Sequence, residues 1–333
     1  MLPGAPQQSR WIRSEPRRSL PSSLLARLVQ SAFPQSRVFD LEPLTDGFRN
    51  SNFKLHLDSH PEPVVLRIYE HDPTLCQKEV DLLACLRGSV PVPEVIYPEP
   101  SGAEDLPPFA FLRYVEGITF RELKRAGDRE AIAQAAHSAG ETLAAIHRTV
   151  FEKPGWLGPG PCVTVPLLEG PHAMARFVDL CLASGHLQRR LPASVCDGVH
   201  ALMWSALPEL ALSEAQTSLV HGDFGRRNVL VRESKGRWAV AAVLDWEFAV
   251  SSTPLTDLAN FLRSERAARP LVEPYFSTGY QQASGSLPPD WRRLARIVDL
   301  VALCSSLTKD SLPADVEVEL AEFVGHALLA HDH

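Results

Sequence analysis

The sequence predicts an α+β protein with two lobes, a small strand-rich N-terminal lobe and a larger helical C-terminal lobe. The first observation is length, since 333 residues suit two domains of ~150 residues each. The second is a change of pattern along the chain. Segments of strand composition dominate residues 21–115, whereas apolar residues recur at helical spacing through much of 116–333. Residues 1–20, rich in arginine, serine and proline, are expected to form a loose arm.

Short apolar segments between turn residues define the N-terminal lobe. The expected elements are a helix over 24–32, strands over 38–44, 52–57 and 63–69, a helix over 74–86 and a strand over 108–115. Asp72 and Pro73 mark the start of the second helix, and Pro91 and Pro93 prevent it from continuing.

The C-terminal lobe starts with helical periodicity from Asp128, which predicts a long buried helix that continues to Val150. The proline- and glycine-rich segment 154–171 is expected to be a loop. The remaining expected elements are two or three helices within 173–212, strands over 218–220, 229–231 and 238–244, and further helices within 255–331. His147 lies inside the long helix and is interpreted as a packed structural histidine.

Composition and charge argue against several classes of protein. A net charge of -7 argues against nucleic-acid binding, which relies on Lys and Arg against phosphate. No run approaches the ~18 apolar residues of a membrane helix, and the N-terminus lacks the pattern of a secretory signal. The six cysteines have neither metal-binding nor redox spacing, and the P-loop, dinucleotide, hydrolase and zinc-protease motifs are absent. We therefore expect a cytoplasmic protein that binds neither nucleic acid nor membrane.

The most specific signal lies in residues 219–231 and 243–247. His221-Gly222-Asp223 is followed by Asn228 on a loop between two expected strands, and Asp245 stands at the end of a third strand. An acid and an amide on one loop can face the same pocket. Phosphoryl transfer needs such a set, because one aspartate accepts the proton of the attacking hydroxyl while an asparagine and a second aspartate hold Mg²⁺ at the phosphates.

These motifs resemble those of the aminoglycoside phosphotransferases and their relatives, the choline, homoserine, hydroxylysine and fructosamine kinases, which have a protein-kinase-like fold. The resemblance extends from about Leu41 to at least Arg263. It implies that Asp223 is the catalytic base and that Asn228 and Asp245 are the metal ligands. It also implies that His221 braces the catalytic loop and that Asp257 anchors the same loop through backbone hydrogen bonds.

The resemblance further implies that the N-terminal lobe binds the nucleotide. Residues 45–53 are similar to the family's phosphate-covering turn. The residues expected to bind the cofactor are Gly47, Asn50, Asn52, Arg67, Glu79, Arg113 and Val115. Arg67 stands where protein kinases have lysine, and we expect it to pair with Glu79 and to contact the phosphates as a bidentate fork.

The predicted function is ATP- and Mg²⁺-dependent transfer of phosphate to a hydroxyl of a small molecule, such as an aminoglycoside, an amino alcohol or a sugar. The alternative is a catalytically silent kinase-like domain that binds nucleotide or a protein partner. The sequence leaves open the acceptor, the choice between ATP and GTP and the oligomeric state. It also leaves open whether Glu247 joins the metal shell or caps a turn, and whether Arg226 or Arg227 reaches the γ-phosphate.

Overall fold

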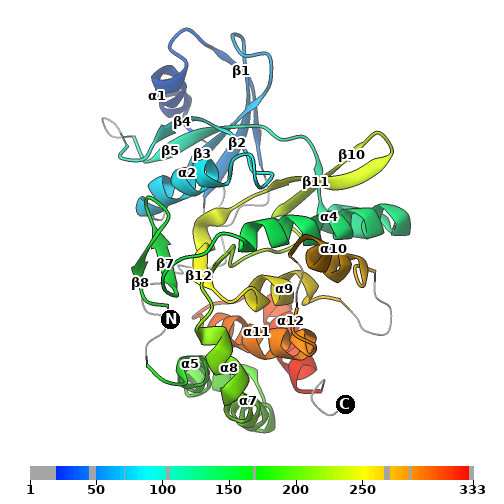
Figure 1. Cartoon of the computed structure of the whole chain (residues 1–333). Helices are drawn as coiled ribbons and strands as arrows, with labels where there is room; N and C mark the ends of the chain where they lie inside the picture. Colours follow the sequence, from blue (N-terminus) through cyan, green and yellow to red (C-terminus); the bar gives the residue numbers. More distant parts are fainter. Residues whose placement is uncertain are drawn as a thin grey trace.

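The structure is a computed structural model that describes residues 20–44, 50–70, 72–102, 106–167, 170–265, 271–284 and 287–329. Within these ranges the chain forms an upper lobe built on a five-stranded sheet and a lower lobe built mainly of helices (Figure 1). The predicted α+β class with two lobes is confirmed. No helix in the described part of the chain combines the length and the apolar character that a membrane span needs.

The N-terminal lobe is an antiparallel sheet in the order β1-β2-β3-β5-β4. Its elements are α1 Ser22–Ala32, β1 Val38–Pro43, β2 Ser51–Leu57, β3 Val64–Ile68, α2 Thr74–Leu86, β4 Val95–Glu99 and β5 Phe109–Arg113. In β2, buried and partly exposed residues alternate as expected for a strand of period two. Leu55 and Leu66 pack with Leu28 of α1 in one core, whereas α2 belongs to the core of the C-terminal lobe. The helix α2 therefore joins the two lobes.

The C-terminal lobe contains most of the helices and two small sheets, in the orders β11-β10-β6 and β8-β7-β12-β9. Its first elements are β6 Ile118–Thr119, α3 Phe120–Ala126, α4 Arg129–His147, β7 Gly155–Gly158, β8 Cys162–Val165, α5 Ala173–Leu182, α6 Gly185–Arg190, α7 Ala193–Ser205 and α8 Leu207–Glu214. Next come β9 Ser218–Val220, β10 Val229–Ser234, β11 Arg237–Val243, the 3₁₀ helix η1 Trp246–Phe248, β12 Val250–Ser252, α9 Leu255–Leu262, α10 Tyr275–Ser284, α11 Trp291–Leu307 and α12 Ala314–Leu329.

The long helix α4 begins where the sequence predicted, since the Asp128 side chain accepts hydrogen bonds from the first free backbone N–H groups. Helix α10 packs directly on it (Figure 1). A Cβ at Gly140 would overlap the carbonyl oxygen of Phe276, and a Cβ at Gly279 would overlap that of His137. The absence of side chains at these two glycines therefore permits the close approach of α4 and α10.

Several sequence-based expectations were wrong. Segment 154–171 is not only a loop, because it contains the β7–β8 hairpin, and β7 pairs with β12. Region 173–214 holds four helices in place of two or three. Strand β4 was not predicted, since Pro98 lowers its strand propensity and is tolerated at the sheet edge. The strand expected over 108–115 ends at Arg113.

Candidate active site

The loop 221–228, which the sequence predicts to be the catalytic loop, connects β9 to β10, and Asp245 follows the end of β11. Strands β10 and β11 are antiparallel, with Val229 paired to Val243. The backbone N–H of Leu244 also donates to the carbonyl oxygen of Asn228 at 2.8 Å. The local hairpin thus brings the loop that carries Asn228 next to the turn that carries Asp245.

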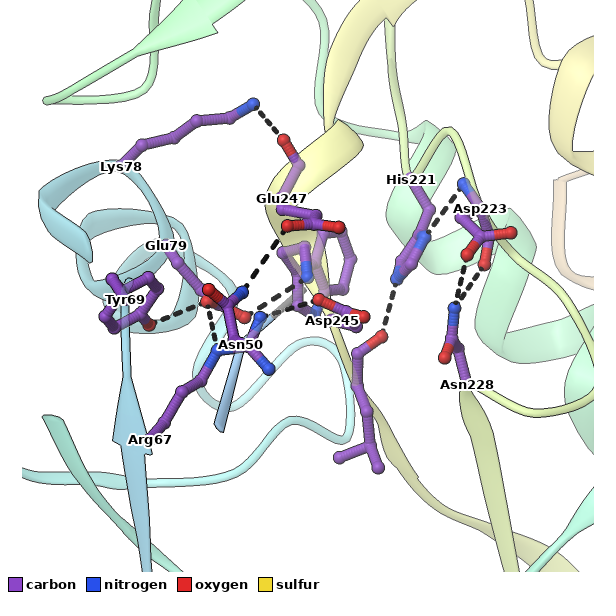
Figure 2. A network of polar contacts seen from close by, with 12 residues as sticks. Asn50, Arg67, Tyr69, Lys78, Glu79, His221, Asp223, Asn228, Asp245 and Glu247 are labelled. Atoms are coloured by element: carbon purple, nitrogen blue, oxygen red, sulfur yellow. Dashed lines mark hydrogen bonds and ion pairs between the residues drawn. The ribbon is translucent and has the colours of Figure 1, made fainter. Parts of the chain in front are cut away.

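Asn228 holds Asp223 in place. Its Nδ2 donates to the backbone oxygen of Asp223 and to Asp223 Oδ2, both at 2.9 Å, so its amide oxygen points away from the carboxyl (Figure 2). Burial raises the pKa of the half-buried Asp223 to about 6, and the negative charge of Asp245 acts in the same direction. His221, Arg263 and the Asn228 hydrogen bond oppose this rise. Asp223 is therefore a more basic carboxylate than an exposed aspartate.

His221 and Asp257 lie beneath the loop, and both are fully buried. The His221 ring accepts from the Asp223 N–H at 3.2 Å through Nδ1 and donates to the Leu244 carbonyl oxygen at 2.9 Å through Nε2. The Asp257 carboxylate accepts from the backbone N–H groups of His221 and Gly222 at 2.7 and 2.9 Å. Both side chains thus contact the backbone of the loop, and their bracing and anchoring roles stay predictions.

His147 of α4 lies behind Asp257 and is buried, as its interpretation as a packed structural residue requires. Its Nε2 lies 3.3 Å from Asp257 Oδ2, and its Nδ1 lies 2.9 Å from the hydroxyl of Tyr280 in α10. His147 therefore links the α4–α10 contact to Asp257, whose carboxylate binds the backbone of the 221–228 loop.

Arg67 of β3 contacts two carboxylates at once. Its Nε lies 2.8 Å from Glu79 Oε2, so the ion pair predicted from the sequence is present. Its Nη2 donates to Asp245 Oδ1 at 2.6 Å, a contact that the sequence did not predict. The Tyr69 hydroxyl also donates to Glu79 at 2.7 Å. The guanidinium fork thus connects the sheet, α2 and the turn of Asp245 (Figure 2).

A pocket between the lobes gathers most of the expected nucleotide-binding and metal-binding residues. The expected site residues that line it are Asn52, Arg67, Glu79, Arg113, Val115, Asn228 and Asp245. Its apolar walls include Val65, Leu83 and Leu230. Gly47 lies outside the described residues. Asn50 is buried, and its Nδ2 donates to Glu247 Oε2 at 3.4 Å, so its side chain joins the lobes and does not line the pocket.

The sequence did not predict that Lys78, the residue before Glu79, contacts the turn that follows Asp245. Its side chain is buried, and its Nζ donates to the carbonyl oxygen of Glu247 at 2.8 Å. Burial lowers the pKa of Lys78 to about 8. The negative charges of Glu79, Glu247 and Asp72 act in the opposite direction and raise it, but burial has the larger effect. Nothing in the sequence distinguishes this lysine from an exposed one, because its partner is a backbone carbonyl far along the chain.

The donor set fits Mg²⁺. The amide oxygen of Asn228 is not used by the Nδ2 contacts, and Asp245 Oδ2 is not the oxygen that Arg67 binds. Mg²⁺ prefers such oxygen ligands and usually keeps water and phosphate oxygens as its other ligands. Over the residues that the structure describes, no group of three or more His, Cys, Asp or Glu side chains forms a metal cage. A site of two protein ligands completed by nucleotide is consistent with both facts.

Comparison with known proteins identifies the family. The model of the "Phosphotransferase enzyme family" matches residues 40–297. Two curated relatives are both called acyl-CoA dehydrogenase family member 11. The protein of Gallus gallus is 27% identical over 237 residues, which are 68% of this chain and 28% of that protein. The protein of Mus musculus is 31% identical over 157 residues, which are 46% of this chain and 18% of that protein. The chain thus spans less than a third of the length of these relatives.

Solved structures share the fold. Aminoglycoside phosphotransferase APH(4)-Ia has a TM-score of 0.64 at 20% identity, with 92% of this chain and 97% of that chain covered. A thermostable mutant of it, in a ternary complex with AMP-PNP and hygromycin B, has a TM-score of 0.63 at 21% identity and covers 91% and 96% of the two chains. The GDP complex of aminoglycoside 2'-phosphotransferase-IIIa has a TM-score of 0.65 at 16% identity and covers 92% and 98%.

The two-lobed α+β fold and the pocket between its lobes define a protein of the kinase-like phosphotransferase class. The chain belongs to the phosphotransferase enzyme family, since the family model matches most of its length. The resemblance to aminoglycoside phosphotransferases drawn from the sequence motifs is confirmed. The class of enzyme predicted from the sequence is the class that the family model describes.

Proposed function

We propose that the protein transfers the γ-phosphate of ATP to a hydroxyl group of a small molecule. Asp223 accepts the proton of the attacking hydroxyl, and Asn228 and Asp245 hold Mg²⁺. The observation that carries the proposal is the geometry around Asp223, a half-buried carboxyl that Asn228 contacts at 2.9 Å, on a loop held by His221 and Asp257. The raised pKa of this carboxyl, about 6, supports the same role. A base works best when its pKa lies near the operating pH.

The nucleotide site is proposed at the pocket between the lobes. Its apolar walls suit the flat face of a base, and Arg113 and Val115 lie where the chain passes from one lobe to the other. In the same pocket, Arg67 orients the Asp245 carboxylate. When bound, Mg²⁺ would neutralise phosphate charge next to Asn228 and Asp245. The role of Gly47 in covering the phosphates remains a prediction from the sequence.

The acceptor is proposed to be a small molecule with a free hydroxyl group. One of the similar solved structures is a ternary complex with hygromycin B, whereas the curated relatives are called acyl-CoA dehydrogenase family members. An acceptor panel should therefore contain aminoglycosides, amino alcohols, sugars and acyl-CoA thioesters that carry a hydroxyl group. GTP is compared with ATP as donor, because one similar structure is a GDP complex.

The test measures release of nucleoside diphosphate with each acceptor, for the wild type and for Asp223→Asn. We expect Asp223→Asn to lower turnover by about 10²–10⁴-fold while MgATP affinity is retained, because Asp223 acts on the hydroxyl and does not hold the nucleotide. Asp310→Asn is the matched control, since the Asp310 side chain is 99% exposed. Equal rates for Asp223→Asn and the wild type would refute the assignment of the base. A wild type that binds MgATP but modifies no acceptor would favour the silent-domain alternative.

A further inference from the structure

Lys78 and Glu79 are consecutive residues of α2, and both contact the backbone of the turn that follows Asp245. Lys78 is 3% exposed and Glu79 is 2% exposed. Lys78 Nζ donates to the carbonyl oxygen of Glu247 at 2.8 Å, and Glu79 Oε1 accepts from the backbone N–H of Trp246 at 3.2 Å. The ammonium group therefore holds a carbonyl of the turn while the carboxylate holds an amide (Figure 2).

Negative charges around Lys78 favour its charged form inside the protein. A buried ammonium group is strongly unfavourable unless it is paired and hydrogen-bonded. Lys78 has the negative charges of Glu79, Glu247 and Asp72 around it. Among the lysines of the described ranges, Lys78 is the only buried one. Its buried ammonium group thus has a hydrogen-bond acceptor, the Glu247 carbonyl oxygen, and negative charges near it.

The turn itself needs such support. Asp245 has φ 67° and ψ 70°, in the left-handed region that residues other than glycine adopt only where surrounding contacts hold them. The two residues that follow it, Trp246 and Glu247, are the ones that Glu79 and Lys78 bind. Helix α2 therefore holds the backbone directly after Asp245, while Arg67 of β3 contacts the carboxylate itself.

Helix α2 is bound to the C-terminal lobe at another place as well. Asp81 Oδ2 accepts from the backbone N–H of Gly160, in the β7–β8 hairpin, at 2.7 Å. This hydrogen bond holds α2 on the lobe without contacting the turn of Asp245. Mutation can therefore separate the docking of α2 from the placement of Asp245.

We propose that Lys78 is a positioning residue that sets the Asp245 carboxylate for Mg²⁺. The inference rests on the proposed function, because it takes Asp245 as a metal ligand. Loss of the ammonium group removes this hydrogen bond to the Glu247 carbonyl oxygen, while the hydrogen bond between Glu79 and the Trp246 N–H stays. The turn can relax, and Asp245 loses the orientation that metal binding needs.

The experiment compares Lys78→Met, Lys78→Arg and Asp81→Ala with the wild type by calorimetric titration of ATP, once with Mg²⁺ and once with EDTA. We expect Lys78→Met to weaken MgATP binding about tenfold, or ~1.4 kcal/mol, near the lower value for a hydrogen bond to a charged group. In EDTA, we expect Lys78→Met and the wild type to bind ATP with equal affinity. Lys78→Arg keeps a cationic donor and recovers most of the MgATP affinity. Asp81→Ala lowers the melting temperature but binds MgATP normally.

Three results would overturn the inference: unchanged MgATP affinity in Lys78→Met, equal weakening in Lys78→Met and Asp81→Ala, or equal losses with Mg²⁺ and with EDTA. If Lys78→Met does not fold, Lys78→Gln takes its place, and the same criteria apply. A wild type that binds no MgATP overturns the proposed function together with this inference. A wild type that binds MgATP with the same affinity as Lys78→Met overturns the inference alone.

Discussion

Arg67→Lys tests whether the guanidinium fork is needed at the junction of the two lobes. Arg67 reaches Glu79 through Nε at 2.8 Å and Asp245 through Nη2 at 2.6 Å. The side chains of Arg67 and Glu79 are only 7% and 3% exposed. Lysine has one compact ammonium group in place of a planar fork. We therefore expect it to keep one of the two contacts and to leave the other carboxylate without its partner.

The expected magnitude follows from the contact that is lost. A hydrogen bond to a charged group contributes about 1.5–3 kcal/mol. Because lysine keeps the positive charge, we expect Arg67→Lys to lower the free energy of unfolding by about 2 kcal/mol. Arg67→Ala leaves both Glu79 and Asp245 without the cation, so the loss should reach about 3–5 kcal/mol. The KM for MgATP should rise with a smaller change in kcat, as expected when ground-state binding is lost.

Urea denaturation and steady-state kinetics measure these two effects. Arg87→Lys is the matched control, because the Arg87 side chain is 69% exposed and pairs with Glu94 at the surface, where an ion pair contributes about 0–1 kcal/mol. If Arg67→Lys unfolds at the same urea concentration as Arg87→Lys and keeps the wild-type KM, the two-carboxylate contact has no energetic role and the reasoning fails.

Four further predictions use other parts of the structure. Asp245→Ala should abolish Mg²⁺-dependent ATP binding in calorimetry, because Asn228 alone offers only a neutral oxygen; unchanged metal dependence would contradict this. The pKa of about 6 at Asp223 should make kcat/KM fall as pH decreases below about 6, since a protonated base accepts no proton; a flat profile down to pH 5 would count against it. Because burial raises this pKa from 3.8 to about 6, wild-type stability relative to Asp223→Asn should fall as pH rises through that window, as urea denaturation at pH 4 and pH 7 would show. Gly140→Ala should lower the free energy of unfolding by about 1–3 kcal/mol, whereas Gly325→Ala, with no atom near the added Cβ, should not.

The sequence by itself determined the segments whose residues are neighbours along the chain. Asp223 and Asn228 share one loop, and the hairpin of β10 and β11 then places Asp245 next to that loop. The long helix after Asp128 and the helix Thr74–Leu86 were also predictable, because capping residues and apolar spacing are local signals. The pairing of Arg67 with Glu79 came from the family resemblance, and the structure contains it.

The tertiary structure alone decided the contacts between distant segments. Arg67 and Asp245 are 178 positions apart, and Lys78 and Glu247 are 169 positions apart. Strand β7 of the β7–β8 hairpin has weak strand composition, with two glycines in four residues, and it pairs with β12, far along the chain. Local patterns report which residues are apolar and where a helix begins. They do not report which backbone carbonyl faces a given lysine, because that depends on how α2 packs against the C-terminal lobe.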